Sequence, residues 1–137
     1  MRSRLEADAT LTGNIIRSLV DGTPFLDRYP VRQAARVVLI DNELSRRTVR
    51  RWLREQGIQN RDRVQVLTLR GQASLFNILD PDVRGRWAKM IGPADVLILD
   101  CLRPAMDALR LSEDKDGGVI TAALDAFREE YDELDVY

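Results

Sequence analysis

The sequence contains no histidine. Histidine is the commonest general base in enzymes, a frequent zinc ligand and the central member of the Ser-His-Asp triad. Its absence excludes that triad and every zinc site that includes an imidazole. Any chemistry must therefore come from carboxylates, arginines, hydroxyls or backbone amides.

Cysteine and long hydrophobic runs are also scarce. Cys101 is the single cysteine, so no disulfide forms within the chain, and a reducing cytoplasm is the compartment we expect. The longest apolar runs, 37–40 and 96–99, are far shorter than the ~20 residues that span a bilayer. A secretory signal requires an apolar stretch after its basic residues, and none follows the first two arginines. We therefore expect a cytoplasmic protein without a membrane partner.

The rest of the composition is typical of one folded domain. The 137 residues are 45% hydrophobic and 31% charged, which suits a single hydrophobic core. Short runs rich in Val, Leu and Ile alternate with segments of helical period, as in parallel sheets covered by helices on both faces. We expect strands at about 37–40, 64–69 and 96–99 and helices at about 9–20, 42–56, 80–91 and 119–131.

The predicted fold class is therefore α/β: a small three-layer structure with a parallel sheet flanked by helices. Three strands leave two open edges, which invite pairing with another chain. Asn42 and Asp80 are the expected caps of the second and third helices. Two connections, 21–35 and 101–118, are predicted to be long and irregular.

Two of the predicted strands end in acidic residues. Asp100 closes the run 96–99, and Glu43 follows the run 37–40. Carboxyl ends of parallel strands are where sites form, and there Asp100 could hold Mg²⁺ and Glu43 could polarise a water. The structural alternative for Glu43 is favourable charge at a helix N-terminus, worth ~0.3–1 kcal/mol.

Arginine is used far more than lysine, and the charge is divided along the chain. Residues 1–93 carry a net charge of +7 and residues 94–137 a net charge of −8. Two explanations stay open: guanidinium groups suit contact with phosphate, and the codons of a high-GC genome would favour arginine without any function. One cluster lies on the second predicted helix: Arg46, Arg47, Arg50, Arg51 and Arg54. It is consistent with a phosphate-facing stripe for nucleic acid and equally with a solvated helix face.

Acidic residues crowd the C-terminus, at Glu129, Glu130, Asp132, Glu133 and Asp135. Acid at a helix C-terminus opposes the helix dipole. We expect residues 132–137 to fray, or the acidic cluster to pair with a basic surface such as the arginine-rich helix. Charge alone leaves open whether that contact lies within one chain or between two.

Together, the segments 13–26 (GNIIRSLVDGTPFL), 29–31, 37–44 and 94–100, with the arginine-rich helix, resemble the RecA-like ATPase domain of the RepA-type replicative helicase family. Such domains occur in actinobacterial and phage proteins. The resemblance covers roughly residues 8–130. It implies a P-loop NTPase core in which Glu43 is the catalytic glutamate and Asp100 is the Walker B aspartate that binds Mg²⁺.

The sequence departs from this family at the phosphate-binding loop. That loop needs the pattern G-x-x-x-x-G-K-[ST], whose glycines let backbone amides cradle phosphate and whose lysine reaches the β/γ-phosphates. The segment 5–10 reads LEADAT, with Asp8 or Ala9 where the lysine belongs. Thr10 could keep a hydroxyl near the magnesium position. The strand before this loop and the strands after the last helix are not found in the sequence.

We therefore expect one domain, 1–137, resembling a partial, degenerate RecA-like core without ATPase activity of its own. It would act as a protein-interaction module, as a homodimer or with a protein partner that covers the open sheet edges, and without a cofactor. The alternative is an ATPase of DNA replication, using ATP and Mg²⁺, whose P-loop comes from a partner chain. DNA binding through the arginine-rich helix is a third possibility.

Overall fold

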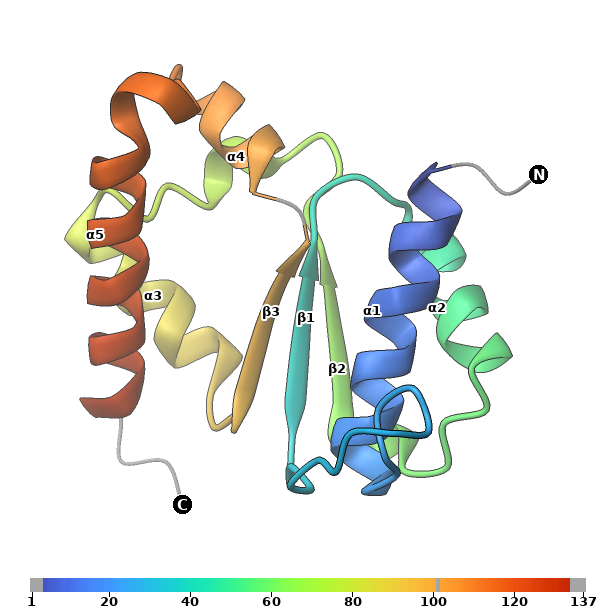
Figure 1. Ribbon diagram of the computed structural model, residues 1–137. Helices are drawn as coiled ribbons and strands as arrows, with labels where there is room; N and C mark the ends of the chain where they lie inside the picture. Colours follow the sequence, from blue (N-terminus) through green and yellow to red (C-terminus); the bar gives the residue numbers. More distant parts are fainter. Residues whose placement is uncertain (1–3, 101, 134–137) are drawn as a thin grey trace.

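The computed structural model describes residues 4–100 and 102–133; the side chains of residues 4–10, 113 and 131–133 lie outside that description. The three strands form one parallel sheet in the order β2-β1-β3, so the predicted α/β class is confirmed (Figure 1). The elements are α1 (Arg4–Asp21), β1 (Val37–Asp41), α2 (Arg46–Glu55), η1 (Arg61–Arg63), β2 (Val64–Thr68), η2 (Ala73–Leu75), α3 (Pro81–Ile91), β3 (Val96–Asp100), α4 (Arg103–Ala108) and α5 (Glu113–Glu133).

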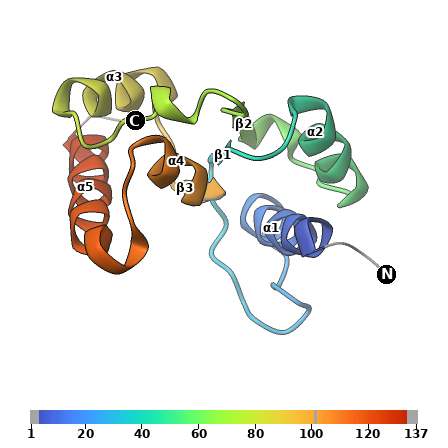
Figure 2. The same cartoon turned by 90° about the horizontal axis from the view of Figure 1, so that it is seen from above.

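Helices cover both faces of the sheet. Figure 2 shows α1 and α2 on one side and α3 and α5 on the other. Successive side chains of a strand point to opposite faces, so β1 feeds two separate cores. Val37 and Leu39 pack with Ile16 and Val49 toward α1 and α2. On the other face, beneath α3 and α5, the core contains Val38, Ile40, Phe76, Ile91 and Phe127.

The central strand and the two outer strands differ in burial. All five residues of β1 are buried, whereas all five residues of β2 and of β3 are half-buried. Within the described residues, each outer strand therefore has one edge without a strand partner, as the sequence predicted.

Several helix ends follow the expected local chemistry. The Asp80 side chain accepts hydrogen bonds from the N–H groups of Asp82 and Val83, at 2.9 and 3.4 Å, and Pro81 begins α3. Gly92 ends α3 with a φ of 67°, a conformation that a residue with a Cβ adopts at a cost. The predicted cap Asn42 is wrong for α2. Ser45 caps that helix by accepting from Thr48 N–H at 3.3 Å.

The two ends of the chain are more helical than the sequence indicated. α1 already begins at Arg4, and the connection 101–118 contains α4 and the first turn of α5. The Asp116 carboxylate accepts from Ser112 N–H at 2.8 Å, which fixes that first turn. α5 continues to Glu133, and residues 134–137 of the predicted frayed tail lie outside the described part. None of the described helices is long and apolar enough to cross a membrane.

Candidate functional site at the carboxyl edge of the sheet

The acidic ends of β1 and β3 lie side by side. Asp41 and Asp100 are direct partners in the strand register. The N–H of Asn42 donates to the Asp100 carbonyl at 2.9 Å, so the two strands stay paired to their last residues. The structure thus places Asp100 at the edge of the sheet where parallel strands form sites.

A hydroxyl from α1 contacts this aspartate. Thr12 Oγ1 donates to Asp100 Oδ2 at 3.5 Å. The sequence pointed instead to Thr10, whose side chain lies outside the described residues. Residues two apart on a helix do not share a face. The helical period therefore gave no reason to choose Thr12 over Thr10. The packing of α1 beside β3 decides which of these threonines contacts Asp100.

Asp41 is the buried carboxyl of this edge, with only 3% of its surface exposed. Burial raises its pKa, and the nearby Glu43 charge raises it further, against two hydrogen bonds that lower it. Those bonds come from the backbone N–H groups of Glu43 and Leu44, at 2.9 and 2.7 Å. Asp41 therefore organises the turn that follows β1, a role the sequence analysis did not assign.

Glu43 lies in that turn with an exposed side chain. It is at the same edge of the sheet as Asp100, but it is not among the residues that line the small cavity beside Asp100. The lining consists of Thr12, Gly13, Leu39, Asp41, Leu44, Val49, Trp52, Leu53 and Asp100.

That cavity is too small for a nucleotide. Its volume is about 20 Å³, enough for roughly one water molecule, whereas small-molecule sites occupy roughly 300–1,000 Å³. The α1–α2 packing behind it is tight, because a Cβ added at Gly13 would lie 2.6 Å from Gln56 Cγ.

The same edge offers a partial donor set for Mg²⁺. Thr12 and Asp100 present the oxygen atoms that this ion prefers. Among the residues whose side chains are described, however, no three acidic or cysteine side chains gather closely enough to hold a metal ion. Thr12 and Asp100 could therefore hold Mg²⁺ only together with phosphate oxygens and water.

The arginine-rich helix borders a much larger hollow, which we call the arginine groove. Its volume is about 900 Å³, and it lies between α2 and the open edge of β2. Arg51 is exposed but does not line it. The groove is lined by Arg46, Arg47, Arg50, Leu53, Arg54, Ile58, Arg61, Val64, Gln65, Val66 and Leu67.

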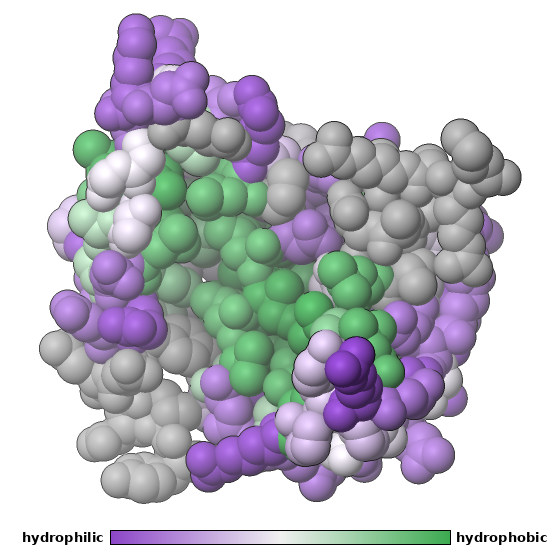
Figure 3. All heavy atoms as spheres, in the orientation of Figure 1, coloured by the Kyte–Doolittle hydropathy of each residue, from purple (hydrophilic) through white to green (hydrophobic). Residues whose placement is uncertain are grey.

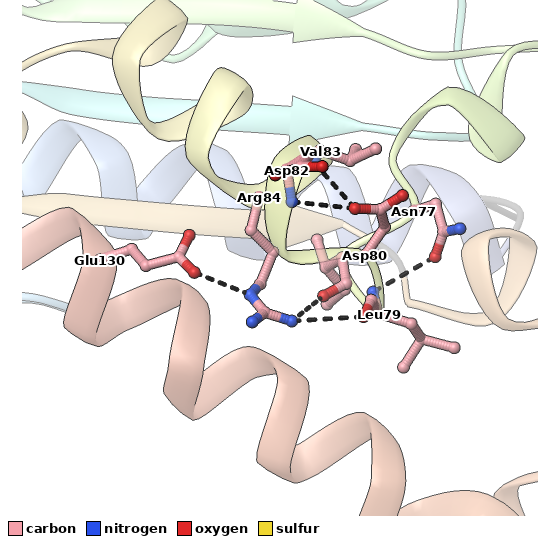
Figure 4. A network of polar contacts seen from close by, with 8 residues as sticks. Asn77, Leu79, Asp80, Asp82, Val83, Arg84 and Glu130 are labelled. Atoms are coloured by element: carbon pink, nitrogen blue, oxygen red, sulfur yellow. Dashed lines mark hydrogen bonds and ion pairs between the residues drawn. The ribbon is translucent and has the colours of Figure 1, made fainter.

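The acidic helix α5 lies away from this groove. It packs against α3 on the other face of the sheet (Figure 2). There Glu130 accepts from Arg84 Nε at 3.1 Å, and Arg84 also donates to the carbonyl of Ile78 at 2.8 Å (Figure 4). For Glu130, pairing with α2 of the same chain, which the sequence left open, is therefore wrong.

The comparisons with known proteins point to an ATPase-like domain. A family model described as an AAA domain matches residues 9–136. No curated protein and no solved structure shows a significant match. The matched segment includes most of α1, the parallel sheet and the Asp41–Asp100 edge, and it covers most of the chain. The chain therefore belongs to the AAA domain family, with a P-loop NTPase-like fold.

Proposed function

We propose that this chain is an AAA-family domain without a phosphate-binding loop of its own, and that it works by accepting a β-strand from a partner protein. The observation that carries the proposal is the open, apolar edge of β3. Figure 3 shows a continuous hydrophobic strip down the face where Figure 1 places β3, between α5 and α1. Exposed apolar surface of this kind marks interaction sites.

The backbone of β3 is ready for a further strand. Val96 N–H donates to the Arg36 carbonyl, and the Asp100 carbonyl accepts from Asn42. The backbone N–H and C=O groups of successive residues in a strand point alternately toward the strand on one side and the strand on the other side. The N–H and C=O groups of Leu97 and Leu99 therefore face the open edge, where an added strand would pair with them.

The helices beside this edge favour a strand over a second intact copy. α1 and α5 both extend past β3 on its open side (Figure 2). Two intact copies that brought their β3 edges together would place these helices in the same space. A strand inserted between α1 and α5 meets apolar side chains on both of its faces, as a buried parallel strand requires.

The usual handedness of connections between parallel strands also predicts that an added strand lies beside β3. Crossovers between parallel strands are almost always right-handed. The chain passes from β1 through α2 to β2 in one direction across the sheet, over one of its faces. It then passes from β2 through α3 to β3 in the other direction, over the other face. By the same rule, a strand that led directly into α1 would lie beyond β3.

The sequence supports the absence of phosphate binding. The segment 5–10 has neither glycine nor lysine, so backbone amides and an ammonium group are not supplied there for a triphosphate. An aspartate at position 8 adds repulsion. We interpret segments 13–26 and 37–44 as a RepA-like origin, and under that interpretation the chain would belong with proteins of DNA replication.

Donor-strand extension tests strand acceptance directly. A copy of residues 35–42, itself a strand buried on both faces, is fused ahead of Met1 through a flexible linker of about eight residues. We expect the melting temperature to rise by about 4 °C or more, roughly 1–2 kcal/mol for a domain of this size.

Matched substitutions at one position make that test specific. Leu97→Pro removes the N–H that faces the open edge and should abolish the rise, because proline cannot donate to an added strand. Leu97→Ala loses the same side chain but keeps the N–H, and the rise should persist. An equal rise in both variants, or no rise in the wild-type background, would overturn strand acceptance.

A second candidate function rests on the Thr12–Asp100 contact. A strand parallel to β3 would end beside these two residues, so its following loop could supply the missing phosphate cradle. Under this reading the partner chain completes an ATP site. Millimolar ATP with Mg²⁺ would then raise the melting temperature of the complex, whereas the chain alone would show no shift under either reading.

A further inference from the structure

The arginine groove lies on the opposite edge of the sheet from β3, and the proposed strand acceptance does not use it. Four exposed arginines of α2 and Arg61 form its charged wall. Its floor is apolar, with Leu53, Ile58, Val64 and Val66 among the lining residues. The side chains of Val64 and Val66 belong to the half-buried rim of the core beneath α1 and α2. Such a groove suits a ligand that carries acidic and apolar groups together.

The lining favours a protein segment over nucleic acid. Single-stranded nucleic acid is held by aromatic side chains on which bases stack, in addition to basic residues. None of the described lining residues is aromatic. Four consecutive residues of β2, 64–67, line the groove. Since alternate side chains point to opposite faces, the groove reaches the open backbone edge, which can pair with a peptide backbone.

The chain carries a segment of matching chemistry. Residues 128–137 contain five acidic residues and one basic residue, interspersed with Tyr131, Leu134, Val136 and Tyr137. Within the described part, Glu129 is exposed, while Glu130 is held by Arg84. Because α5 packs on the other face of the sheet from α2, this segment meets an arginine groove most simply in a second copy.

We propose that the arginine groove binds the acidic C-terminal segment, residues 128–137, of a second copy of this chain. Glu130 stays with Arg84 of its own chain. The other acidic side chains of the segment pair with the arginine wall, and its apolar side chains cover the floor. One surface of one copy then contacts a different surface of the next, so the association is head-to-tail rather than two-fold. It depends on protein concentration and weakens with salt.

Direct binding of a labelled peptide tests this proposal. The peptide spans residues 124–137 and is titrated with the full-length chain at low salt, with fluorescence anisotropy as the readout. The double variant Arg50→Glu/Arg54→Glu reverses two charges of the groove wall and should weaken binding by about tenfold or more, equivalent to about 1.4 kcal/mol. The same variant should reduce self-association in sedimentation equilibrium.

The control variant carries the same charge change outside the groove. Arg51→Glu/Arg86→Glu changes two exposed arginines, one on the same helix α2 and one on α3, and neither lines the groove. It should bind the peptide within about twofold of the wild type. Circular dichroism verifies that both double variants remain folded.

Three results would overturn the proposal. The first is no peptide binding by the folded wild-type chain at low salt. The second is an equal loss of binding in the two double variants. The third is a single-stranded oligothymidine that binds more tightly than the peptide, displaces it and depends on Arg50 and Arg54, which would make the groove a nucleic-acid site.

Discussion

Thr12 on α1 donates its hydroxyl hydrogen to Asp100 at the end of β3, 88 positions further along the chain, at 3.5 Å. This contact joins a helix that covers the sheet to the strand at its open edge. It also sets a hydroxyl beside a carboxylate at the point where an added strand would end. In the proposed account, the pair secures the edge in the free chain and lies beside any loop that a partner brings.

Replacing the hydroxyl tests whether this contact holds the edge. Thr12→Val keeps the shape of the side chain but leaves the partly buried Asp100 carboxylate without this donor. We expect a loss of about 1 kcal/mol in the free energy of unfolding, measured by urea denaturation. Thr12→Ser retains the hydroxyl and should lose less. Equal losses in the two variants would assign the effect to the methyl group.

Asp41 should give stability a dependence on pH. Its folded-state pKa is raised, chiefly by burial, so its contribution is fully present below the ordinary carboxyl pKa of about 3.9 and is lost as pH rises through the folded value. Asp41→Asn keeps an oxygen acceptor for the N–H groups of Glu43 and Leu44 without the charge. The stability of the variant relative to wild type should therefore increase between pH 4 and pH 7. A constant difference over that range would contradict the buried carboxyl.

Asp21 should act in the opposite direction. Burial raises its pKa, but hydrogen bonds from the N–H groups of Gln59 and Asn60 at 2.9 Å, from the Asn60 side chain at 3.0 Å, and the charge of Arg17 lower it below its usual range. Its contribution is present above pH 4 and is lost as pH falls through the folded pKa. Asp21→Asn should cost about 1 kcal/mol at pH 7, and the difference from wild type should shrink below pH 4. A difference that persists unchanged at pH 2.5 would count against this role.

Arg84 should matter more for stability than a neighbouring exposed arginine. Its side chain is 13% exposed and bridges Glu130 to the carbonyl of Ile78 (Figure 4). Arg84→Met leaves a partly buried carboxylate and a carbonyl without their donor, at a cost of roughly 1–3 kcal/mol. Arg86→Met, on the exposed side of α3, should change the free energy of unfolding by less than about 0.5 kcal/mol. Thermal unfolding of the two variants compares them directly.

Much of the fold was predictable because local signals agreed with the tertiary structure. The three apolar runs became the three parallel strands, and Asp80 with Pro81 began α3 as expected. Asn42 was a reasonable cap by residue type, but its N–H continues the ladder between β1 and β3, so the helix begins later at Ser45. α4 was missed because a six-residue helix shows too little periodicity to stand out from a loop.

The site was predictable in its place but not in its details. Acidic strand ends located the carboxyl edge of the sheet, and Asp100 lies there. The contact of Thr12 depends on how α1 rotates against β3, which no local pattern encodes. The arginine groove likewise depends on the distance between α2 and the edge of β2. The sequence shows five arginines on α2, but it does not distinguish Arg51, which lies outside the groove, from the four arginines of α2 that line it.

Calorimetric titration of ATP with Mg²⁺ into the purified chain tests most directly whether the chain forms a nucleotide site by itself. We expect no binding heat up to millimolar nucleotide from a chain that circular dichroism shows to be folded. Segment 5–10 lacks a phosphate cradle, and the cavity beside Asp100 has room for roughly one water molecule. Stoichiometric binding in the micromolar range, weakened by Asp100→Asn, would contradict it. That result would mean that the chain forms a complete nucleotide site by itself.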